Sequence, residues 1–467
     1  MSITSINPAT EEVEATFEGH SSEDVERALA TAIDTFRDWR KTTFEHRAQL
    51  MRNAAKYLRD NKERFARLMT AEMGKPITQA QGEVEKCAWC CEFYAENAAT
   101  FLADQEKPSS ATESYVAFDP LGPVLAIMPW NFPFWQVFRF AAPGLMAGNV
   151  GILKHASNVP RSALAIEEVF REAGFPEGAF QSLLVSGSAA QEMIADDRIT
   201  AVTLTGSDFA GARVAEASGR ALKKNVFELG GSDPYIVLSD ADVEAAAAMA
   251  VTARYQNTGQ SCIAAKRFIV ADEIADDFTT RFIEAAQRLR VGDPMESETE
   301  VGPLAREDLL TDLEDQLQRS VSQGARLLSG GHRVERKGYF YEPTVVGDVT
   351  PEMPVFAEET FGPLAAIIRA KDADQAIEYA NRSQYGLGAN LWTRDIDTAR
   401  RFARDIEAGS VFINGMVASD PRLPFGGVKR SGYGRELGEF GIREFVNIKT
   451  VWIGPQRTQS PAPPTAE

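Results

Sequence analysis

One cysteine of the chain lies in a segment whose composition suits a reactive thiol. Cys262 ends the stretch Y-Q-N-T-G-Q-S-C, in which small and polar residues surround a glycine. Such a stretch is typical of a turn rather than of a core element. A thiol that leaves this turn and enters a following helix has its thiolate stabilised by the N–H groups of the helix N-terminus. Cys262 is therefore a candidate nucleophile, and a partly buried loop cysteine of no consequence is the alternative.

Two further polar residues stand at predicted strand ends, where α/β proteins bind ligands. Asn131, in P-W-N-F-P, follows the apolar run V-L-A-I-M, and a rigidly held amide there can donate a hydrogen bond to a developing oxyanion. Glu228, in F-E-L-G-G-S-D-P, lies within an apolar run, where burial raises the pKa of a carboxyl and suits it to act as a general base. A simple turn at Asn131 and a solvent-facing carboxylate at Glu228 are the alternatives.

Two more segments have residues that suit a nucleotide. In T-G-S-D-F-A-G, Gly206 and Gly211 follow an apolar run and open a predicted helix, so that backbone N–H groups can approach a phosphate. The spacing differs from the G-x-G-x-x-G fingerprint. In E-E-T-F-G-P, Glu359 can accept hydrogen bonds from ribose hydroxyls while Phe361 supplies an aromatic wall. Ordinary turns are the alternative at both places.

The other three cysteines, in C-A-W-C-C, follow a different pattern. Cys87, Cys90 and Cys91 are spaced i, i+3, i+4, as on the buried face of a helix, where unpaired cysteine packs as a small hydrophobic residue. A metal site needs more ligands than these, and the four histidines are scattered along the chain. We therefore predict core positions for these cysteines and no metal site.

The elements that position these residues follow from the hydrophobic pattern. Long amphipathic helices are predicted over the first hundred residues, one beginning near Ser21 and others over about 44–72 and 76–103. Short apolar runs then alternate with helical stretches, which indicates βα units and a mostly parallel sheet. These runs are 124–128, 151–154, 182–185, 201–205, 226–229 and 235–238, and a second series covers 267–270, 365–368, 390–393 and 411–414. The fold class is α/β, with a second α/β domain that starts soon after Gly231.

The bulk properties are those of a cytoplasmic protein. The chain has 467 residues, which is too long for one core, and no secretory signal or membrane span is evident. The net charge of −18 argues against nucleic acid and anionic membranes as partners. Segments 113–119 and 445–452 alternate like exposed strands that can pair with another subunit, and the Pro-rich tail 456–467 is predicted to be disordered.

Taken together, in this order and spacing, the segments resemble the aldehyde dehydrogenase superfamily. The resemblance runs from I-N-P-A-T to F-V-N-I-K-T-V-W and includes P-F-G-G-V-K-R-S-G-Y-G-R-E. Within the superfamily the chain looks most like the short bacterial succinate-semialdehyde dehydrogenases, with K-H-A-x-N and Y-Q-N-T-G-Q. The resemblance implies a Rossmann-type NAD(P)-binding domain, an α/β catalytic domain, an oligomerisation arm and a homodimer or homotetramer. The expected bounds are 1–108 with 121–230, then 231–430, then 109–120 with 440–455.

The resemblance also implies a reaction, the NAD(P)-dependent oxidation of succinate semialdehyde to succinate through a cysteine thiohemiacetal and thioester. Cys262 would be the nucleophile, the Asn131 side chain and the Cys262 N–H would hold the oxyanion, and Glu228 would activate water. The residues expected to contact the cofactor are Trp130, Lys154, Ser157, Gly206, Ser207, Leu229, Glu359 and Phe361.

Position 157 bears on the choice of nicotinamide. Many NAD-preferring relatives have Glu three residues after the equivalent of Lys154, where it repels a 2′-phosphate. Here the residue is Ser157, which removes the repulsion and can hydrogen-bond phosphate, while Lys154 supplies positive charge. We therefore expect NADP to be accepted alongside NAD, leave the preference between them open, and expect no metal to be needed.

Three residues are expected to bind the substrate. Arg139, eight residues after Asn131, matches the Arg of succinate-semialdehyde enzymes. Many of these relatives have a second Arg six residues before the nucleophile, but here that residue is Gln256, which can hydrogen-bond a carboxylate without adding charge. Ser419 can supply another donor. The position two residues after the nucleophile is Ala264 rather than the second cysteine of some relatives, so no disulfide switch is expected there.

Other functions stay open at this point. Glutarate semialdehyde, an uncharged aliphatic aldehyde or a betaine-type aldehyde are alternative substrates for the same chemistry. A cysteine hydrolase would need a histidine near the thiol, and neither His155 nor His332 lies in a recognisable pairing motif. A binding protein without activity would have no need of Cys262, Glu228 and Asn131 together.

Overall fold

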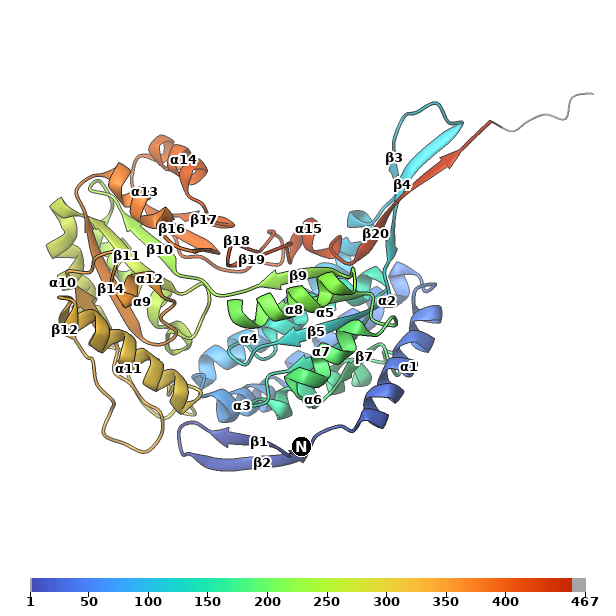
Figure 1. Cartoon of the computed structure of the whole chain (residues 1–467), viewed down its shortest axis with the longest axis horizontal. Coiled ribbons are helices and arrows are strands. Elements are labelled where there is room, and N and C mark those ends of the chain that lie inside the picture. Colours follow the sequence, from blue (N-terminus) through green and yellow to red (C-terminus); the bar gives the residue numbers. More distant parts are fainter. Residues whose placement is uncertain (1, 456–467) are drawn as a thin grey trace, which may run out of the picture.

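The computed structural model describes residues 2–455, and two β-sheets organise it (Figure 1). A hairpin and four helices precede the first sheet: β1 (Ser2–Asn7), β2 (Glu12–Glu18), α1 (Ser22–Trp39), α2 (Phe44–Asp60), α3 (Lys62–Met73) and α4 (Ile77–Phe101). Ser21 caps α1, as predicted, because its hydroxyl accepts from the N–H of Asp24 while the Asp24 carboxylate accepts from the N–H of Ser21. The helix expected over 44–72 is two helices, since the chain leaves helical geometry at Asn61.

The first sheet has six strands in the order β19-β9-β8-β5-β6-β7. Its strands are β5 (Pro123–Met128), β6 (Val150–His155), β7 (Phe180–Ser182), β8 (Ala201–Thr205), β9 (Lys224–Glu228) and β19 (Gly432–Tyr433). All pairs are parallel except β19 with β9. The helices that alternate with them are α5 (Trp135–Ala147), α6 (Pro160–Glu172), α7 (Gly187–Ala195) and α8 (Asp208–Arg220). The run predicted at 182–185 is therefore strand only at its first residue.

The second sheet has seven strands in the order β12-β13-β14-β11-β10-β16-β17. They are β10 (Asp233–Val237), β11 (Ala265–Ala271), β12 (Arg326–Ser329), β13 (Thr344–Gly347), β14 (Leu364–Ala370), β16 (Gly388–Trp392) and β17 (Ser410–Ile413). Short elements outside the two sheets are η1 (Gln256–Gly259), η2 (Asp272–Ile274), α12 (Pro354–Ala357), α15 (Gly438–Ile442), β15 (Tyr385–Gly386) and β18 (Val428–Lys429). The chain enters this sheet between β9 and β10, as the change of pattern near Gly231 predicts.

Each face of the second sheet has a hydrophobic core of its own. Tyr235 and Val237 of β10 pack with α9 (Val243–Tyr255) and α10 (Ala275–Ala286), whereas Ile236 packs on the opposite side. That second core includes α11 (Glu307–Ser322), α13 (Ala373–Asn381) and α14 (Ile396–Asp405). Successive strand residues point to opposite faces, so continuous apolar runs are required for a sheet buried on both sides.

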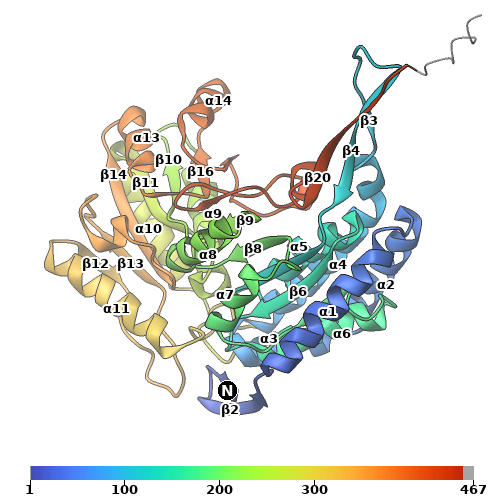
Figure 2. The same cartoon turned by 45° about the vertical axis from the view of Figure 1, so that its right-hand side comes forward.

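A three-stranded arm projects from the side of the first sheet that lies away from the second (Figures 1 and 2). It consists of β3 (Gln105–Glu106), β4 (Glu113–Pro120) and β20 (Val446–Ile453), with β4 in the centre. The strands predicted at 113–119 and 445–452 exist, and they pair with each other, antiparallel, from Val446 opposite Pro120 to Ile453 opposite Glu113. Among residues 2–455, β20 is an edge strand of this sheet and β3 pairs with β4 only at Tyr115 and Val116, so the pairing of these strands with another subunit stays a prediction. The tail 456–467 lies outside the described residues.

No helix within residues 2–455 is long and apolar enough to cross a membrane.

Candidate active site

The two domains meet at the carboxyl ends of the parallel strands of the first sheet. Asn131 follows β5, Gly206 follows β8, and Glu228 is the last residue of β9. Parallel strands present their carboxyl ends at one edge, so these residues gather there. Cys262 approaches this edge from the second domain, in the short connection between η1 and β11. Cys262 lines two cavities, one on each side of it.

The loop that carries Cys262 is held in an unusual conformation. Asn257 and Thr258 have positive φ of 54° and 57°, followed by Gly259 at 73°. The amide of Asn257 donates to the carbonyls of Asn131, at 2.8 Å, and of Gln260, at 3.1 Å. Left-handed backbone at non-glycine residues is costly and persists where the surroundings enforce it. These contacts link the Cys262 loop directly to the P-W-N-F-P turn.

The element that follows Cys262 differs from the sequence-based expectation. A strand, β11, begins at Ala265, and no helix N-terminus lies at the thiol. The strand predicted at 267–270 is present, and only two residues separate Cys262 from its start, which leaves no room for the helix expected at the thiol. Burial instead raises the pKa of Cys262 to about 12, against the opposing charges of Arg139 and Lys266. The resting thiol is therefore protonated at neutral pH.

Lys266 is a site residue that the sequence analysis missed. Its buried ammonium donates to the carbonyls of Ser261, at 2.9 Å, and Cys262, at 2.8 Å. The same nitrogen lies 3.6 Å from a carboxylate oxygen of Glu359, which also accepts from the N–H of Gly231 at 3.0 Å. Lys266 thus ties the Cys262 loop to the Glu359 segment. Two adjacent basic residues, Lys266 and Arg267, at the start of an apolar run were the available signal.

Asn131 is buried and lines one of the two cavities. Its side-chain nitrogen donates to the carbonyl of Gln260 at 3.0 Å, which uses one of its two hydrogens. Its side-chain oxygen accepts from the amide of Gln136 at 3.1 Å, so the amide has a single orientation. The second amide hydrogen remains for a ligand.

Glu228 lies behind the cavities rather than in their walls. It is fully buried, neither carboxylate oxygen has a hydrogen-bond partner, and it lines neither cavity. Burial, and then the nearby Glu436, raise the pKa of Glu228 well above its usual value. Gly426, with φ of 150°, leaves space for this carboxyl, because a Cβ there would lie 2.6 Å from a Glu228 oxygen. Burial therefore favours the protonated form of this carboxyl, which must move to reach bound substrate.

Arg139 lies on α5, buried, with its charge already paired. Its guanidinium forms an ion pair with Glu436, donates to the Thr205 hydroxyl at 3.3 Å, and stacks over Phe425 at 4.7 Å. The burial expected from its apolar neighbours is present. Glu436 is another residue that the sequence analysis missed, and P-F-G-G-V-K-R-S-G-Y-G-R-E, which contains it, gave no sign of a buried ion pair.

The larger cavity, of about 430 Å³, collects most of the residues expected to contact a cofactor. Trp130 and Phe361 contact each other edge to face, with ring centroids 5.8 Å apart. Ser207 caps α8, whose N-terminal N–H groups point to this edge of the sheet. The expected residues that line the cavity are Trp130, Gly206, Ser207, Leu229, Glu359 and Phe361. Aromatic walls, a helix N-terminus and a carboxylate fit a dinucleotide.

Lys154 and Ser157 do not line the larger cavity. Lys154 lies near the carboxyl end of β6, and burial lowers the pKa of its ammonium. Ser157 is exposed in the loop that follows β6. Both residues belong to the same edge of the sheet as Gly206, two strands away from it, since β5 separates β6 from β8.

The smaller cavity, of about 140 Å³, includes all three residues expected to bind a substrate. Arg139 and Ser419 are buried, whereas Gln256 is exposed and its side chain makes no recorded hydrogen bond among the described residues. Lys86, on α4, also lines this cavity and was missed, because a lysine beside the cysteines of C-A-W-C-C matches no motif. No Asp or Glu is among the lining residues.

The three cysteines of α4 are buried and unpaired, as predicted. Burial raises the pKa of Cys87, Cys90 and Cys91 above the usual value for a thiol. The thiol of Cys90 lies 3.9 Å from the carbonyl of Phe138, on α5, so this face of α4 packs against the helix that carries Arg139. Among residues 2–455 no cluster of three or more potential metal ligands occurs.

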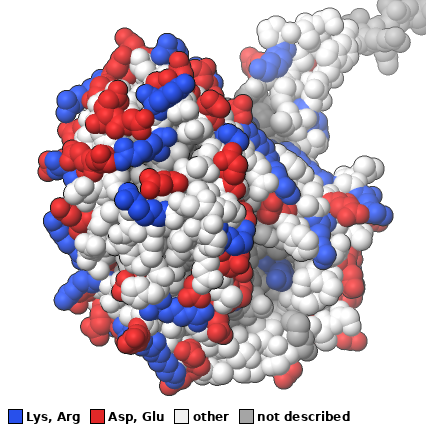
Figure 3. All heavy atoms as spheres, turned by 60° about the vertical axis from the view of Figure 1, so that its left-hand side comes forward, with Lys and Arg blue, Asp and Glu red and all other residues white. Residues whose placement is uncertain are grey.

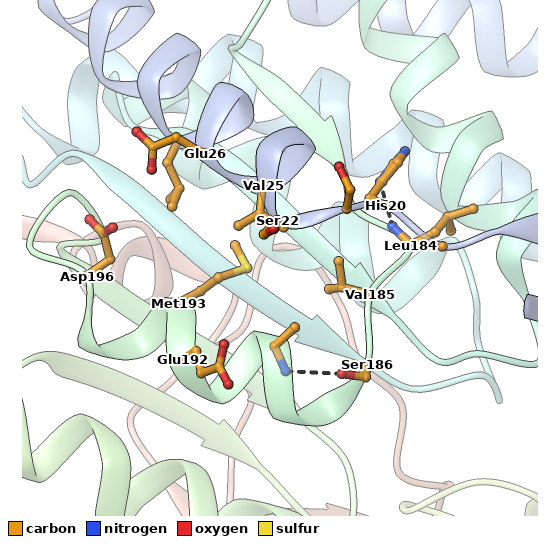
Figure 4. A pocket seen from close by; sticks show the side chains of 14 residues that line it. His20, Ser22, Val25, Glu26, Leu184, Val185, Ser186, Glu192, Met193 and Asp196 are labelled. Atoms are coloured by element: carbon orange, nitrogen blue, oxygen red, sulfur yellow. Dashed lines mark hydrogen bonds between the residues drawn. The ribbon is translucent and has the colours of Figure 1, made fainter. Parts of the chain in front are cut away.

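A third cavity, of about 330 Å³, lies between the start of α1 and helix α7 (Figure 4). His20 and Ser186 border it, and Glu26, Glu192 and Asp196 add negative charge (Figure 4). None of the proposed catalytic residues lines this cavity, so it is separate from the site at Cys262. Elsewhere, acidic and basic side chains are interspersed over the face seen in Figure 3.

Comparisons with known proteins agree with this geometry. A probable succinate-semialdehyde dehydrogenase (NADP(+)) of Synechocystis is 54% identical over 453 residues, 97% of this chain and 100% of that protein. Succinate-semialdehyde dehydrogenase (NADP(+)) 1 of Mycobacterium tuberculosis is 51% identical over 456 residues, with the same coverage of both chains. The crystal structure of succinic semialdehyde dehydrogenase from Streptococcus pyogenes with NADP+ superposes with a TM-score of 0.95 at 38% identity, covering 97% of this chain and all of that one.

The pattern of the aldehyde dehydrogenase family matches residues 1–451, which include the arm, both sheets and the loop of Cys262. The expected fold class and resemblance are thereby confirmed. The chain belongs to the aldehyde dehydrogenase family.

Proposed function

We propose that this enzyme oxidises succinate semialdehyde to succinate, with NADP+ or NAD+ as the hydride acceptor. One observation carries the proposal: Cys262 lies between two cavities of opposite character. The larger has the aromatic, glycine and carboxylate groups that suit a dinucleotide, and the smaller has cations and no carboxylate. The names of the relatives that are 51–54% identical support the same substrate and cofactor.

In the proposed mechanism, the Cys262 thiol loses its proton to solvent, and the thiolate attacks the aldehyde carbon to form a thiohemiacetal. The backbone N–H of Cys262 and the free amide hydrogen of Asn131 stabilise the oxyanion. A nicotinamide held in the larger cavity would accept the hydride, and the acyl group would then remain on the sulfur as a thioester. Glu228 loses its proton to solvent as it leaves its buried position, swings toward the sulfur, and accepts a proton from the water that hydrolyses the thioester.

We assign the cofactor to the larger cavity and the adjoining loops. Glu359 would bind the ribose nearest the nicotinamide, Gly206 and Ser207 would lie against the pyrophosphate, and Lys154 would contact the adenosine ribose. Ser157 supports NADP+ as the preferred acceptor, because an exposed hydroxyl at this position does not repel a 2′-phosphate and can donate to it. NADP+ also occurs in the names of the relatives above.

We assign the substrate to the smaller cavity, where Arg139, Gln256 and Ser419 would contact it. Positive charge favours a carboxylate-bearing aldehyde over an uncharged one of the same length. Glutarate semialdehyde remains the alternative, since it differs by one methylene. The unpaired edge of β20 supports assembly into a homodimer or homotetramer through the arm.

The test is the appearance of reduced nicotinamide absorbance over a panel of aldehydes, with each cofactor. We expect the highest kcat/KM with succinate semialdehyde and NADP+, and a fall of at least about 10,000-fold in Cys262→Ala, as when a covalent nucleophile is removed. Equal rates with butanal and succinate semialdehyde would contradict the substrate proposal. Complete rejection of NADP+ would contradict the argument from Ser157.

A further inference from the structure

We propose that Lys86, on α4, binds the substrate carboxylate and determines the preference of the smaller cavity for a charged aldehyde. The inference rests on the proposed function and specifies it further. It follows from the charges, hydrogen bonds and burial of the cavity wall, and not from any motif around Lys86.

The smaller cavity contains two cations, and one of them is already neutralised. Arg139 forms a buried ion pair with Glu436 and donates to Thr205. A paired guanidinium in a buried site attracts a second anion far less than a free one, because Glu436 repels that anion. Arg139 therefore shapes the cavity without supplying an uncompensated charge.

Lys86 is the cation of this cavity that lacks a counter-ion. No Asp or Glu within residues 2–455 forms an ion pair with it, although the side chain is half-buried. Its ammonium donates to the hydroxyl of Ser419 at 2.8 Å and lies 4.2 Å from the ring of Trp135. Neither contact supplies negative charge, and an ammonium withdrawn from water gains most from an anion. Two of its three hydrogens remain for such a ligand.

Ser419 completes the carboxylate site. Its hydroxyl oxygen accepts from Lys86 and also from the indole N–H of Trp135, at 2.9 Å. A serine hydroxyl has two acceptor positions and one hydrogen, so both acceptor positions are occupied. No acceptor for that hydrogen is found among the described residues, and it can donate to a carboxylate oxygen. Lys86 and Ser419 together therefore present donors alone, which an anion satisfies and a neutral alkyl group does not.

The position of Lys86 also accounts for Gln256. The succinate-semialdehyde enzymes that this chain resembles often have an arginine there, and this chain has an exposed, uncharged glutamine. Lys86 reaches the same cavity from a different helix, in the first domain. The charge absent from the nucleophile side of the cavity is thus supplied from α4.

The experiment compares succinate semialdehyde with butanal, an uncharged aldehyde of the same length, in native enzyme, Lys86→Met and Lys86→Arg. We expect Lys86→Met to lower kcat/KM for succinate semialdehyde by about 10- to 100-fold, as for the loss of a charged hydrogen bond, mainly through KM. The change with butanal should be less than about threefold. Lys86→Arg keeps the charge and should restore most of the preference.

Lys223→Met is a matched control. Lys223 is half-buried and donates to the carbonyl of Asp196. Neither residue lines the smaller cavity. Loss of this lysine should leave the ratio of the two aldehydes unchanged. Thermal unfolding of each variant separates a folding defect from a binding defect, and Lys86→Gln replaces Lys86→Met if the latter does not fold.

A second readout keeps this inference apart from the proposed function. Succinate should inhibit butanal oxidation competitively, and Lys86→Met should raise its inhibition constant by the same 10- to 100-fold. Equal losses of kcat/KM for both aldehydes in Lys86→Met, or an unchanged inhibition constant for succinate, would overturn the role of Lys86. A native enzyme with no preference for succinate semialdehyde, but with inhibition by succinate that depends on Lys86, would overturn the proposed function alone.

Discussion

The two cavities beside Cys262 share one sulfur atom but differ in charge. The larger has the carboxylates of Glu359 and Asp312 and the guanidinium of Arg306 in its wall, and the smaller has Lys86 and Arg139 with no carboxylate. Each polarity suits one reactant of the proposed function, since carboxylates accept hydrogen bonds from ribose hydroxyls and cations bind an acidic aldehyde. In that function each cavity would recognise one molecule, and the thiol lies where both would reach it.

The largest loss of activity is expected on substitution of Glu228, which lines neither cavity. We expect Glu228→Gln to lower kcat by about 100- to 1,000-fold, as for loss of a general base, while the binding of both reactants persists. A burst of one equivalent of reduced nicotinamide per active site should precede the slow phase. Rapid mixing with absorbance detection measures it, and loss of the burst together with the steady rate would place Glu228 before the thioester instead.

A smaller effect is expected at Lys266, which joins the two sides through the Cys262 carbonyl and Glu359. Lys266→Met should raise KM for the cofactor about tenfold, because Glu359 loses its charged partner, and slow the alkylation of Cys262 by iodoacetamide. Steady-state kinetics and alkylation rates measure these.

Arg267→Met is the matched control for Lys266. Arg267 is the next residue of β11, equally buried, and donates to the carbonyls of Ser232, Tyr379 and Ala380, away from the site. It should lower the melting temperature without changing cofactor KM. If both variants changed KM alike, Lys266 would be a structural residue only.

The smallest effect is a pH dependence of the preference for charge. Burial, and then Arg139, lower the pKa of Lys86 to about 8. The ammonium that binds a carboxylate is present below this pKa and lost above it, so the ratio of kcat/KM for succinate semialdehyde to that for butanal should fall as pH rises. At pH 9, about one unit above the pKa of Lys86, the ratio should have fallen by about tenfold at most.

The ratio of the two kcat/KM values cancels the pH dependence due to Cys262, because its thiolate fraction rises with pH for both aldehydes. A flat ratio in Lys86→Arg would assign the titration to Lys86, and an unchanged slope there would contradict the assignment. The titratable and charged groups that face Lys86 are Glu83, Cys87 and Cys90 on α4, Arg139 on α5, and Asp420 in the loop after β17, which pairs with Arg422.

The parts of the site that were predictable are those encoded in contiguous segments. The turn before Cys262, the strand before Asn131 and the glycine turn before α8 all have local signals, and the structure contains each of them. Local pattern failed at the residues directly after Cys262: the strand predicted at 267–270 is present, but it begins at Ala265, so the helix expected at the thiol is absent.

The sequence alone established the family, the α/β class and the passage into the second sheet near Gly231, because each is encoded in segments of a few adjacent residues, and it singled out Cys262 as a candidate nucleophile. Which charges lie around each cavity depends instead on how the chain folds. Lys86, Arg139, Glu436 and Ser419 are distant in sequence, and their pairing is set by packing between α4, α5 and the loops after β17 and β19. Electrostatic interaction depends on distance and burial, which no linear spacing contains.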